Sequence, residues 1–253
     1  CDMAQILDMV PNNMGVGADN RWWVDVLENG QASPYADFFD INWQSQEEEL
    51  KNHILLPVLG NYFGSVLEEG LLRLVFTPDR GSFFISYYEH LYPVAPKTYP
   101  DILGHDLQRL ETRLGSQHEG FLELQSLIAS FAGLPGREEI SEEKIEMRHR
   151  NKEVLKRLLA RLCREVAEIA TFIEENIIYY NGEAGRPESF DPLERLLAMQ
   201  VYRLAFWRVA SDEINYRRFF DINDLAGIRM ERKEVFDETH RFVLDLIATG
   251  KID

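Results

Sequence analysis

The feature that most constrains the fold is a long helical periodicity in the middle of the chain. Between residues 103 and 131, apolar residues recur every three or four positions, which is the spacing of one buried helix face. Leu134-Pro135-Gly136 interrupts the pattern. A second stripe runs from Val154 to Ile177, and Ser141 can cap the helix that carries it. The pattern predicts one long helix in this second region and a predominantly helical chain.

Short apolar segments before this region have the length and composition of strands. Residues 54–59, 71–76 and 83–88 are rich in Ile, Val, Leu, Phe and Tyr, and turn residues such as Pro78-Asp79 and Arg80-Gly81 separate them. We expect these segments to form a small antiparallel sheet, with 71–76 and 83–88 as a hairpin.

Both ends of the chain have the pattern of an α/β repeat. Residues 6–10 predict a buried strand, and an apolar face from Leu193 to Ala205 predicts a helix that begins at Asp191-Pro192. A last helix is expected from about Glu234 to Gly250, with its inward positions at Phe236, Val243, Leu246 and Ile247. Residues 251–253 read like the start of another strand, so we expect a piece cut from a longer α/β protein.

Composition and spacing exclude several classes of function. The chain has 27 Lys and Arg against 43 Asp and Glu, a net charge of −16, so nucleic acid and anionic membrane are not expected partners. The sequence has no transmembrane stretch, leader pattern or disulfide framework, since its two cysteines are Cys1 and Cys163. We expect a cytoplasmic protein. The six histidines show no metal-ligand spacing, and nucleotide-binding and serine-hydrolase motifs are absent, so no metal and no cofactor is predicted.

The first candidate site is the polar cluster after residues 6–10. Asp8, Asn12 and Asn13 offer a carboxylate and two amides, which can orient a hydroxyl-rich ligand through directional hydrogen bonds. The alternative is a turn in which the asparagines bond only their own backbone.

The second candidate site lies in residues 213–221. Tyr216, Arg217 and Arg218 stand among aromatic and acidic residues and could hold a carboxylate network and a sugar ring. The alternative is a structural ion-pair hub. A basic run at 148–164 has acidic neighbours on both sides, and we interpret it as salt-bridged helix faces.

At the same residues the sequence resembles the maltooligosyltrehalose synthases of the α-amylase superfamily. The matching text is Ile-Leu-Asp-Met-Val-Pro-Asn at 6–12, Asp-Asn-x-Trp-Trp-x-Asp-Val-Leu-Glu-Asn-Gly at 19–30, Leu-Leu-Pro-Val-Leu-Gly at 55–60, Tyr-Arg-Leu-Ala-x-Trp-Arg at 202–208, Asn-Tyr-Arg-Arg-Phe-Phe-Asp at 215–221 and Val-Phe-x-x-Thr-His at 235–240. Residues 8–13 correspond to the superfamily motif Asp-x-x-x-Asn-His, and Asn13 stands where the family has histidine.

The resemblance implies a fold and a reaction. The fold would be α+β, a partial (β/α)8 TIM barrel with a large inserted subdomain, from the third barrel strand to just before the fourth. The family converts the reducing-end α-1,4 linkage of a maltooligosaccharide into an α,α-1,1 linkage by intramolecular transglycosylation, with a carboxylate nucleophile and an acid. Both groups would lie beyond Asp253, so no catalytic residue is expected in this chain, and its own trehalose-forming activity is expected to be absent.

The resemblance also implies a division of the chain and a set of partners. Residues 1–18 would hold a barrel strand and substrate loop, 19–100 an inserted subdomain with the small sheet, 101–190 a helical insertion, and 191–253 the return and crossover helices. The partners would be a maltooligosaccharide and the remainder of the parent barrel. The sequence leaves open another amylase-type hydrolase segment and a non-catalytic carbohydrate-binding or helical assembly module.

Overall fold

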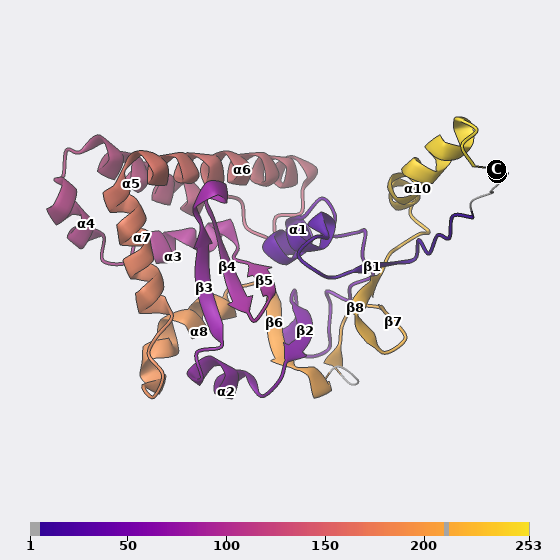
Figure 1. The fold of residues 1–253 in the computed structure, drawn as a ribbon, viewed down its shortest axis with the longest axis horizontal. Coiled ribbons are helices and arrows are strands. Elements are labelled where there is room, and N and C mark those ends of the chain that lie inside the picture. Colours follow the sequence, from indigo (N-terminus) through magenta and orange to yellow (C-terminus); the bar gives the residue numbers. More distant parts are fainter. Residues whose placement is uncertain (1–5, 210–212, 253) are drawn as a thin grey trace, which may run out of the picture.

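A computed structural model describes residues 6–209 and 213–252, and helices hold about half of the chain (Figure 1). The α-helices are α1 (Arg21–Asn29), α2 (Phe63–Glu68), α3 (Tyr99–Leu103), α4 (Leu107–Leu114), α5 (Glu119–Ala132), α6 (Glu142–Glu165), α7 (Ala167–Tyr180), α8 (Asp191–Ala198) and α10 (Lys233–Ala248). The strands are β1 (Asn13–Gly15), β2 (Ile54–Leu59), β3 (Leu72–Thr77), β4 (Ser82–Tyr87), β5 (His90–Pro93), β6 (Tyr202–Phe206), β7 (Arg218–Phe219) and β8 (Ile222–Gly227). The expected α+β class, rich in helix and with small sheets, is confirmed. Cys1 and Asp253 lie outside the described residues.

The long apolar stripe of the middle region belongs to two helices, so the prediction of one long helix is wrong. Helix α6 ends at Glu165, and Val166 takes extended angles of φ −128° and ψ 98° before α7 begins. The Val166 side chain lies close against Gly120 at the start of α5. A continuous stripe cannot reveal such a break, because both helices turn their apolar faces to the same core. Figure 1 shows α7 descending from the end of α6 beside β3.

Strands β3, β4 and β5 form an antiparallel sheet, and the predicted hairpin is confirmed. Leu72 pairs with Tyr87 and Thr77 pairs with Ser82, so the register continues without a shift to the turn. Strand β5 adds to the outer side of β4. Asn181, just after α7, fastens this sheet to the helices: its side chain accepts from the Leu74 N–H (2.6 Å) and donates to the Leu74 carbonyl (3.0 Å).

Residues 54–59 do form a strand, but not in the antiparallel sheet where we expected it. Strand β2 pairs in parallel with β6, beginning with Ile54 opposite Tyr202. The helix predicted to begin at Asp191-Pro192 was expected to continue to residue 205, and this is wrong, since α8 ends at Ala198. The buried Gln200 side chain donates to the Leu196 carbonyl (2.6 Å) and accepts from Ala95 N–H (2.8 Å), which satisfies backbone groups at this junction. Long-range pairing thus overrides the local helical period.

The β3–β4 turn packs directly on α6. Gly81 has a left-handed φ of +57°, and a Cβ atom there would lie 1.9 Å from the Lys156 carbonyl oxygen. Such a distance leaves no room for a side chain, and the positive φ also favours glycine. Gly81 therefore fixes how closely the hairpin approaches the long helix.

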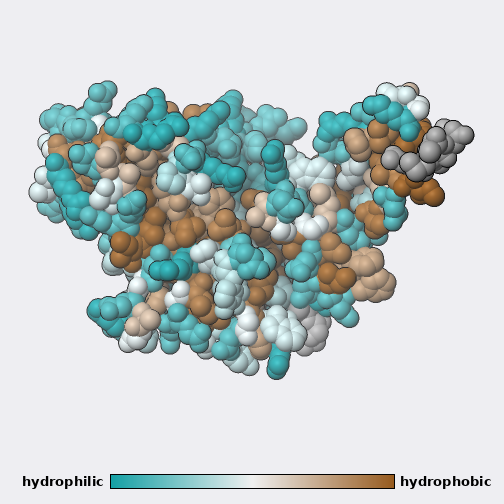
Figure 2. Space-filling view, in the orientation of Figure 1, coloured by the Kyte–Doolittle hydropathy of each residue, from teal (hydrophilic) through white to brown (hydrophobic). Residues whose placement is uncertain are grey.

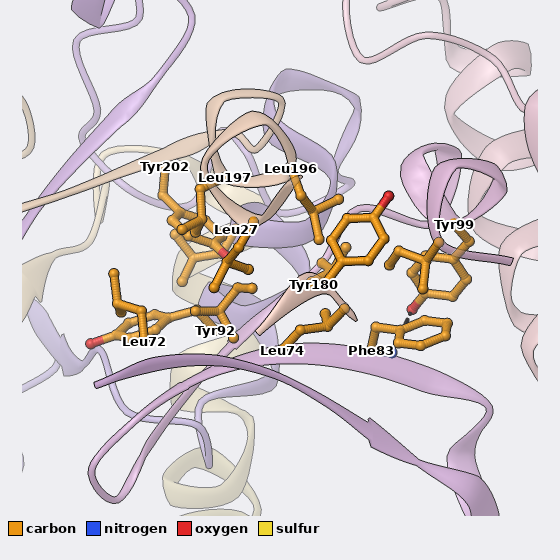
Figure 3. Close-up of a cluster of buried hydrophobic side chains, with 14 of the residues drawn as sticks. Leu27, Leu72, Leu74, Phe83, Tyr92, Tyr99, Tyr180, Leu196, Leu197 and Tyr202 are labelled. Atoms are coloured by element: carbon orange, nitrogen blue, oxygen red, sulfur yellow. Dashed lines mark hydrogen bonds between the residues drawn. The ribbon is translucent and has the colours of Figure 1, made fainter. Parts of the chain in front are cut away.

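The core lies where the β3–β4–β5 sheet meets the surrounding helices and β6. Figure 3 shows Leu72, Leu74 and Phe83 of the sheet facing Tyr99, Leu196 and Tyr202. These six side chains are all nearly inaccessible to solvent. Burial of one such side chain contributes about 1.5–3 kcal/mol, so this contact is a main source of stability. The set drawn in Figure 3 with labels comprises Leu27, Leu72, Leu74, Phe83, Tyr92, Tyr99, Tyr180, Leu196, Leu197 and Tyr202.

Residues 6–10 form no strand, and the prediction of a buried strand there is wrong. Ile6 is 98% exposed and Val10 is 62% exposed. A parallel barrel strand takes its hydrogen bonds from neighbouring strands. In the described part of the chain, the first backbone hydrogen bond to another strand region comes after these residues, at Asn12, whose carbonyl accepts from the Ile228 N–H (2.9 Å).

Helix α10 forms as predicted, but apart from Val235 in its first turn its apolar side chains are half-buried or exposed. Figure 1 shows α10 standing away from the body of the molecule near residues 6–10, and Figure 2 shows hydrophobic residues gathered on this arm. Phe236 is 42% exposed and Ile247 is 49% exposed, so the inward placement expected for these two side chains is wrong, while Val243 and Leu246 are half-buried. The periodicity identifies an apolar face but not what covers it. Lys251 and Ile252 are not in a strand.

Candidate functional site

Asn12 and Asn13 lie close to residues 216–218 at a three-stranded sheet, although the two groups come from opposite ends of the chain. The strand order is β1–β8–β7, with both pairs antiparallel. Asn13 pairs with Gly227, and Arg218 pairs with Ala226 beside it. Strand β8 therefore holds the two predicted clusters next to each other. Asp8 precedes this sheet and is exposed.

The two adjacent arginines brace this sheet through groups of the chain itself. Arg217 donates to the Asp40 carboxylate (2.9 Å) and to the Ile228 carbonyl (2.7 Å), and it crosses β8 at Gly227. Arg218 donates to the Asn223 side chain and lies 3.3 Å from the Asp221 carboxylate. These contacts are those of an ion-pair hub that joins β7 to the neighbouring loop.

Tyr216 occupies the centre of this region. It is only 5% exposed, and its hydroxyl donates to the Asn223 carbonyl (3.0 Å). Its ring lies edge to face with Trp23 of α1, with 5.3 Å between ring centroids. Trp23 is held in place from the start of its helix, because the Asn20 side chain accepts from the Trp22 and Trp23 N–H groups at 3.2 Å.

Asn215 positions the Tyr216 segment, and the sequence did not identify this role. Its side chain donates to the His53 carbonyl (2.7 Å) and to the Asn42 carbonyl (3.2 Å), and it accepts from the Leu55 N–H (3.0 Å). A buried amide with this many partners joins three separate segments of the chain. Asn215 stands in the segment Asn-Tyr-Arg-Arg that the sequence analysis singled out, but the groups that its side chain binds lie far away in sequence.

Trp23 and Tyr216 line a cavity of about 180 Å³, which we call the aromatic pocket. Tyr92 adds a third ring, and Leu56 and Val58 of β2 add apolar walls. The polar residues that line it are Glu89, His90, Asn223 and Asp224. Rings on one side and hydrogen-bonding groups on the other suit a small ligand with both apolar and hydroxyl surfaces.

The phenols of the aromatic pocket stay protonated. Burial raises the pKa of Tyr216 well above its ordinary value, and the nearby Asp224 carboxylate raises it further. The same two causes raise the pKa of Tyr92. Neutral tyrosines beside a carboxylate supply donors and acceptors without a reactive phenolate, so the pocket is better suited to binding than to nucleophilic chemistry.

A larger and more polar cavity of about 650 Å³ lies beside residues 213–217. Tyr216 lines both this polar cavity and the aromatic pocket, whereas Arg217 lines the polar cavity but not the aromatic pocket. The remaining lining residues are Asp40, Ile41, Asn42, Ser45, Gln46, Glu47, Leu50, Glu213, Ile214 and Asn215. Of the six residues predicted from sequence, Tyr216 and Arg217 thus border cavities of the described molecule.

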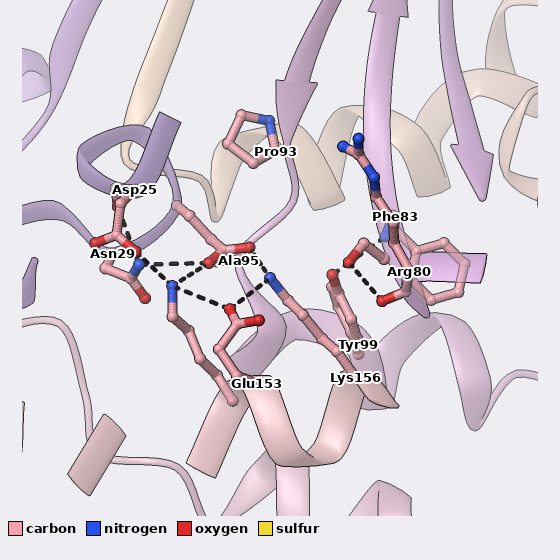
Figure 4. Close-up of polar contacts among 12 residues, drawn as sticks. Asp25, Asn29, Arg80, Phe83, Pro93, Ala95, Tyr99, Glu153 and Lys156 are labelled. Atoms are coloured by element: carbon pink, nitrogen blue, oxygen red, sulfur yellow. Dashed lines mark hydrogen bonds and ion pairs between the residues drawn. The ribbon is translucent and has the colours of Figure 1, made fainter. Parts of the chain in front are cut away.

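A buried ion network joins α1 to α6, and its partners were not apparent from the sequence (Figure 4). Glu28 accepts from Lys152 (2.6 Å) and also pairs with Lys156, and Lys152 pairs in addition with Asp25 (2.6 Å). Glu28, Lys152 and Lys156 are each less than a tenth exposed. The predicted salt bridging of the basic run is present, but its strongest partners come from α1 and not from the acids that flank the run.

The network fixes the charge of its carboxylates. Burial alone would raise the pKa of Glu28, but Lys156 and Lys152 outweigh burial and hold this pKa below its ordinary value. Burial also opposes ionisation of Asp25, and the neighbouring His149 and Lys152 side chains hold the pKa of Asp25 far below its ordinary value. Both acids are therefore ionised at neutral pH, and the network is structural in its first role.

His53 is held as a neutral ring between two guanidinium groups. Its Nδ1 donates to the Lys51 carbonyl (2.7 Å), so its Nε2 accepts from Arg203 (2.8 Å) and Arg137 (3.1 Å). Burial and then the charges of Arg203 and Arg137 lower the pKa of His53 to about 4. A lone pair engaged in this way cannot bind a metal. Across residues 6–209 and 213–252, no three or more His, Cys, Asp or Glu side chains are grouped as metal ligands would be.

No helix in the two described ranges has both the length and the hydrophobicity that a membrane crossing requires.

Comparison with known proteins gives one family name. A Mycobacterium tuberculosis protein, named as a maltooligosyl trehalose synthase, is 39% identical over 89 residues, which cover 31% of this chain and 11% of the relative. The corresponding protein of strain H37Rv matches equally. No protein-family model matches the chain.

The comparison with solved structures finds proteins of the same name. The structure of maltooligosyltrehalose synthase from Arthrobacter ramosus matches with a TM-score of 0.50 and 27% identity, over 97% of this chain and 19% of that protein. A further maltooligosyl trehalose synthase structure matches with a TM-score of 0.50 and 21% identity over 93% of this chain. The resemblance to maltooligosyltrehalose synthases is therefore confirmed. The chain spans about a tenth of the length of the curated relatives and about a fifth of the solved structures.

Proposed function

We propose, from this similarity to maltooligosyltrehalose synthases, that the chain is a segment of a trehalose-forming enzyme and contributes to its substrate site. The longer enzyme would convert the reducing-end α-1,4 linkage of a maltooligosaccharide into an α,α-1,1 linkage by intramolecular transglycosylation. This retaining chemistry needs a nucleophilic carboxylate and an acid, which we place outside the chain. The part played by this segment is therefore binding, within an incomplete (β/α)8 barrel.

The uncovered apolar surfaces at both chain ends support a larger assembly. Ile6 and Phe242 are exposed by 98% and 68%, and the exposed face of α10 adds Leu244 and Ile247. Exposed apolar side chains gathered in one region mark a surface that another surface covers. We propose that the remainder of the parent barrel is the partner, because α10 and residues 6–10 are the elements that the resemblance assigns to the barrel.

The aromatic pocket is the observation on which the binding proposal depends. A glucose ring offers C–H surface that would contact the parts of Trp23 and Tyr216 that line the pocket, and hydroxyl groups that would bond with Asp224 and His90. Tyr216 and Arg217 border cavities directly. We propose that Asn12, Asn13 and Arg218 border the substrate through their place on the β1–β8–β7 sheet, with Asp8 on the segment that leads into it.

Replacing Asp224 by alanine is expected to weaken maltopentaose binding about tenfold or more, since hydrogen bonds to a charged group contribute roughly 1.5–3 kcal/mol. Asp224 is exposed, so the substitution should leave the fold intact. The measurement is isothermal titration calorimetry of the 253-residue chain with maltopentaose. Asp245→Ala, on the exposed side of α10, is the matched control and should bind like the unmodified chain. Equal affinities for the Asp224→Ala and Asp245→Ala variants would contradict this placement of the sugar.

The same samples, incubated with maltopentaose, test the division of labour. We expect no non-reducing sugar to form, because the segment would hold neither catalytic carboxylate. Trehalose-forming turnover by the purified chain would refute that part of the proposal.

A further inference from the structure

The chain contains two Asn-Gly pairs, Asn29-Gly30 and Asn181-Gly182, and the fold gives them different surroundings. An asparagine that precedes a glycine is chemically labile, because glycine has no Cβ atom to hinder the approach of its backbone nitrogen to the preceding side chain. How fast such a pair reacts depends on how firmly the fold holds it. The two pairs therefore provide a comparison within one molecule.

Asn29-Gly30 is held tightly at the end of α1. Asn29 is 1% exposed, and its side chain donates to the Asp25 carbonyl (3.0 Å) and accepts from the Arg148 side chain (3.0 Å). The Gly30 N–H donates to the Val26 carbonyl. The amide group that would be attacked and the nitrogen that would attack it are thus both engaged in a buried site.

Asn181-Gly182 lies at the end of α7, where an exposed loop begins (Figure 1). Asn181 is half-buried, and the hydrogen bonds of its side chain go to the backbone of one residue, Leu74 of β3. Among the described residues, no partner is found for the Gly182 N–H. Residues 183–188, which follow, are exposed. Contact with a single strand is therefore what protects this pair.

The folded conformation keeps Asn181 away from the reactive arrangement only while that contact lasts. Asn181 has φ −76° and ψ −6°, and this ψ places the Gly182 nitrogen close to the Asn181 backbone nitrogen and not beside its side chain. Ring closure between the two residues requires rotation about ψ and release of the side chain from Leu74. Helix ends open at a much lower free energy than buried sites, so this pair is exposed to the reaction far more often than Asn29-Gly30.

We propose that Asn181 is a site of spontaneous deamidation, which is reached when the end of α7 opens from β3. In the open state the Gly182 backbone nitrogen attacks Cγ of Asn181 and gives up its proton. The Cγ–Nδ2 bond breaks, and the side-chain nitrogen leaves with that proton as ammonia. Water then opens the five-membered succinimide ring to aspartate or isoaspartate. Water is the co-reactant, and this inference does not depend on the proposed function.

The product does not restore the contact with β3. In the unmodified chain the Asn181 NH₂ group donates to the Leu74 carbonyl (3.0 Å), and the Asn181 oxygen accepts from the Leu74 N–H (2.6 Å). Aspartate replaces the donor by an acceptor oxygen that faces the Leu74 carbonyl, and isoaspartate also lengthens the main chain. Because two facing acceptors disfavour the closed state, deamidation makes the opening of α7 from β3 permanent.

The first test is peptide mapping by mass spectrometry of the unmodified chain after incubation in mildly alkaline buffer. We expect conversion at Asn181 to be at least about tenfold faster than at Asn29, because the end of α7 opens locally and Asn29 is buried. In denaturing urea both pairs lose their contacts, and the two rates should approach each other. Equal rates in buffer, or faster conversion at Asn29, would overturn the proposed site.

The second test examines the consequence with the Asn181→Asp variant. Hydrogen exchange at the Leu74 amide should become about tenfold faster than in the unmodified chain, since one hydrogen bond is lost and an acceptor is left without a donor. Asn61→Asp is the matched control, because it adds the same charge at an exposed asparagine, and it should leave this exchange unchanged. Equal exchange at Leu74 in the two variants would overturn the permanent opening.

Discussion

Replacing Glu28 by glutamine is expected to destabilise the chain by about 3–5 kcal/mol, the cost of removing one partner from a buried ion pair. Glutamine has nearly the same shape but no charge. Lys152 would keep Asp25 as a partner, whereas Lys156 would keep only the Glu153 carboxylate at 3.6 Å. Lys156 is 7% exposed, so water cannot replace the lost charge. Urea unfolding followed by circular dichroism measures the change, and Glu48→Gln on the surface should change stability by less than about 0.5 kcal/mol.

The pH dependence gives the same network a second readout. The pKa values of Glu28 and Asp25 are lower in the folded chain than their ordinary values, so the unfolded chain binds more protons in acid. Their stabilisation is complete above the unfolded pKa, near pH 4, and is lost as the pH falls through the folded values. The Glu28→Gln variant should therefore lose less stability on acidification than the unmodified chain. Parallel acid unfolding curves for the two proteins would contradict this role.

Replacing Gly81 by alanine is expected to be equally damaging, at about 3–5 kcal/mol or loss of the folded state. Two effects add at this position. A left-handed backbone costs about 1–2 kcal/mol for a residue with a Cβ atom, and that atom would lie 1.9 Å from the Lys156 carbonyl oxygen. The turn or α6 must then move, which separates the hairpin from the helix.

Gly70 provides the matched control because it isolates the backbone effect. It has a φ of +68°, and a Cβ atom there would meet nothing within 4 Å. Gly70→Ala should therefore lose only about 1–2 kcal/mol in the same urea titration. If both alanine variants lost the same amount, the close contact between Gly81 and α6 would not be a determinant of stability.

The sequence predicted best the elements that local pattern determines. The β3–β4 hairpin follows from two apolar segments and the turn residues between them, and α5 and α6 follow from their helical period. The break at Val166 could not be predicted, because the apolar stripe continues across it. Strand β6 was missed for a different reason: its stability comes from pairing with β2, far away in sequence.

The site was predictable in part, and the limit was long-range contact. Residues 12–13 and 216–218 were identified separately, but their approach on β8 depends on strand pairing that no local pattern contains. The basic run on α6 was visible, whereas Glu28 in α1 stands too far away to be recognised as its partner. Helix α10 shows the converse, since its apolar period is evident and the described chain does not cover it.

The central claim is that the aromatic pocket binds a maltooligosaccharide. The most direct test is a titration with maltopentaose, monitored by ¹⁹F NMR of the chain labelled with 5-fluorotryptophan. The chain has four tryptophans, and a Trp23→Phe variant assigns the Trp23 signal. Because Trp23 lines the aromatic pocket, we expect its signal to shift and to saturate, while Trp207, which lies outside that pocket, stays constant. A Trp23 signal that does not change at saturating maltopentaose would contradict the account.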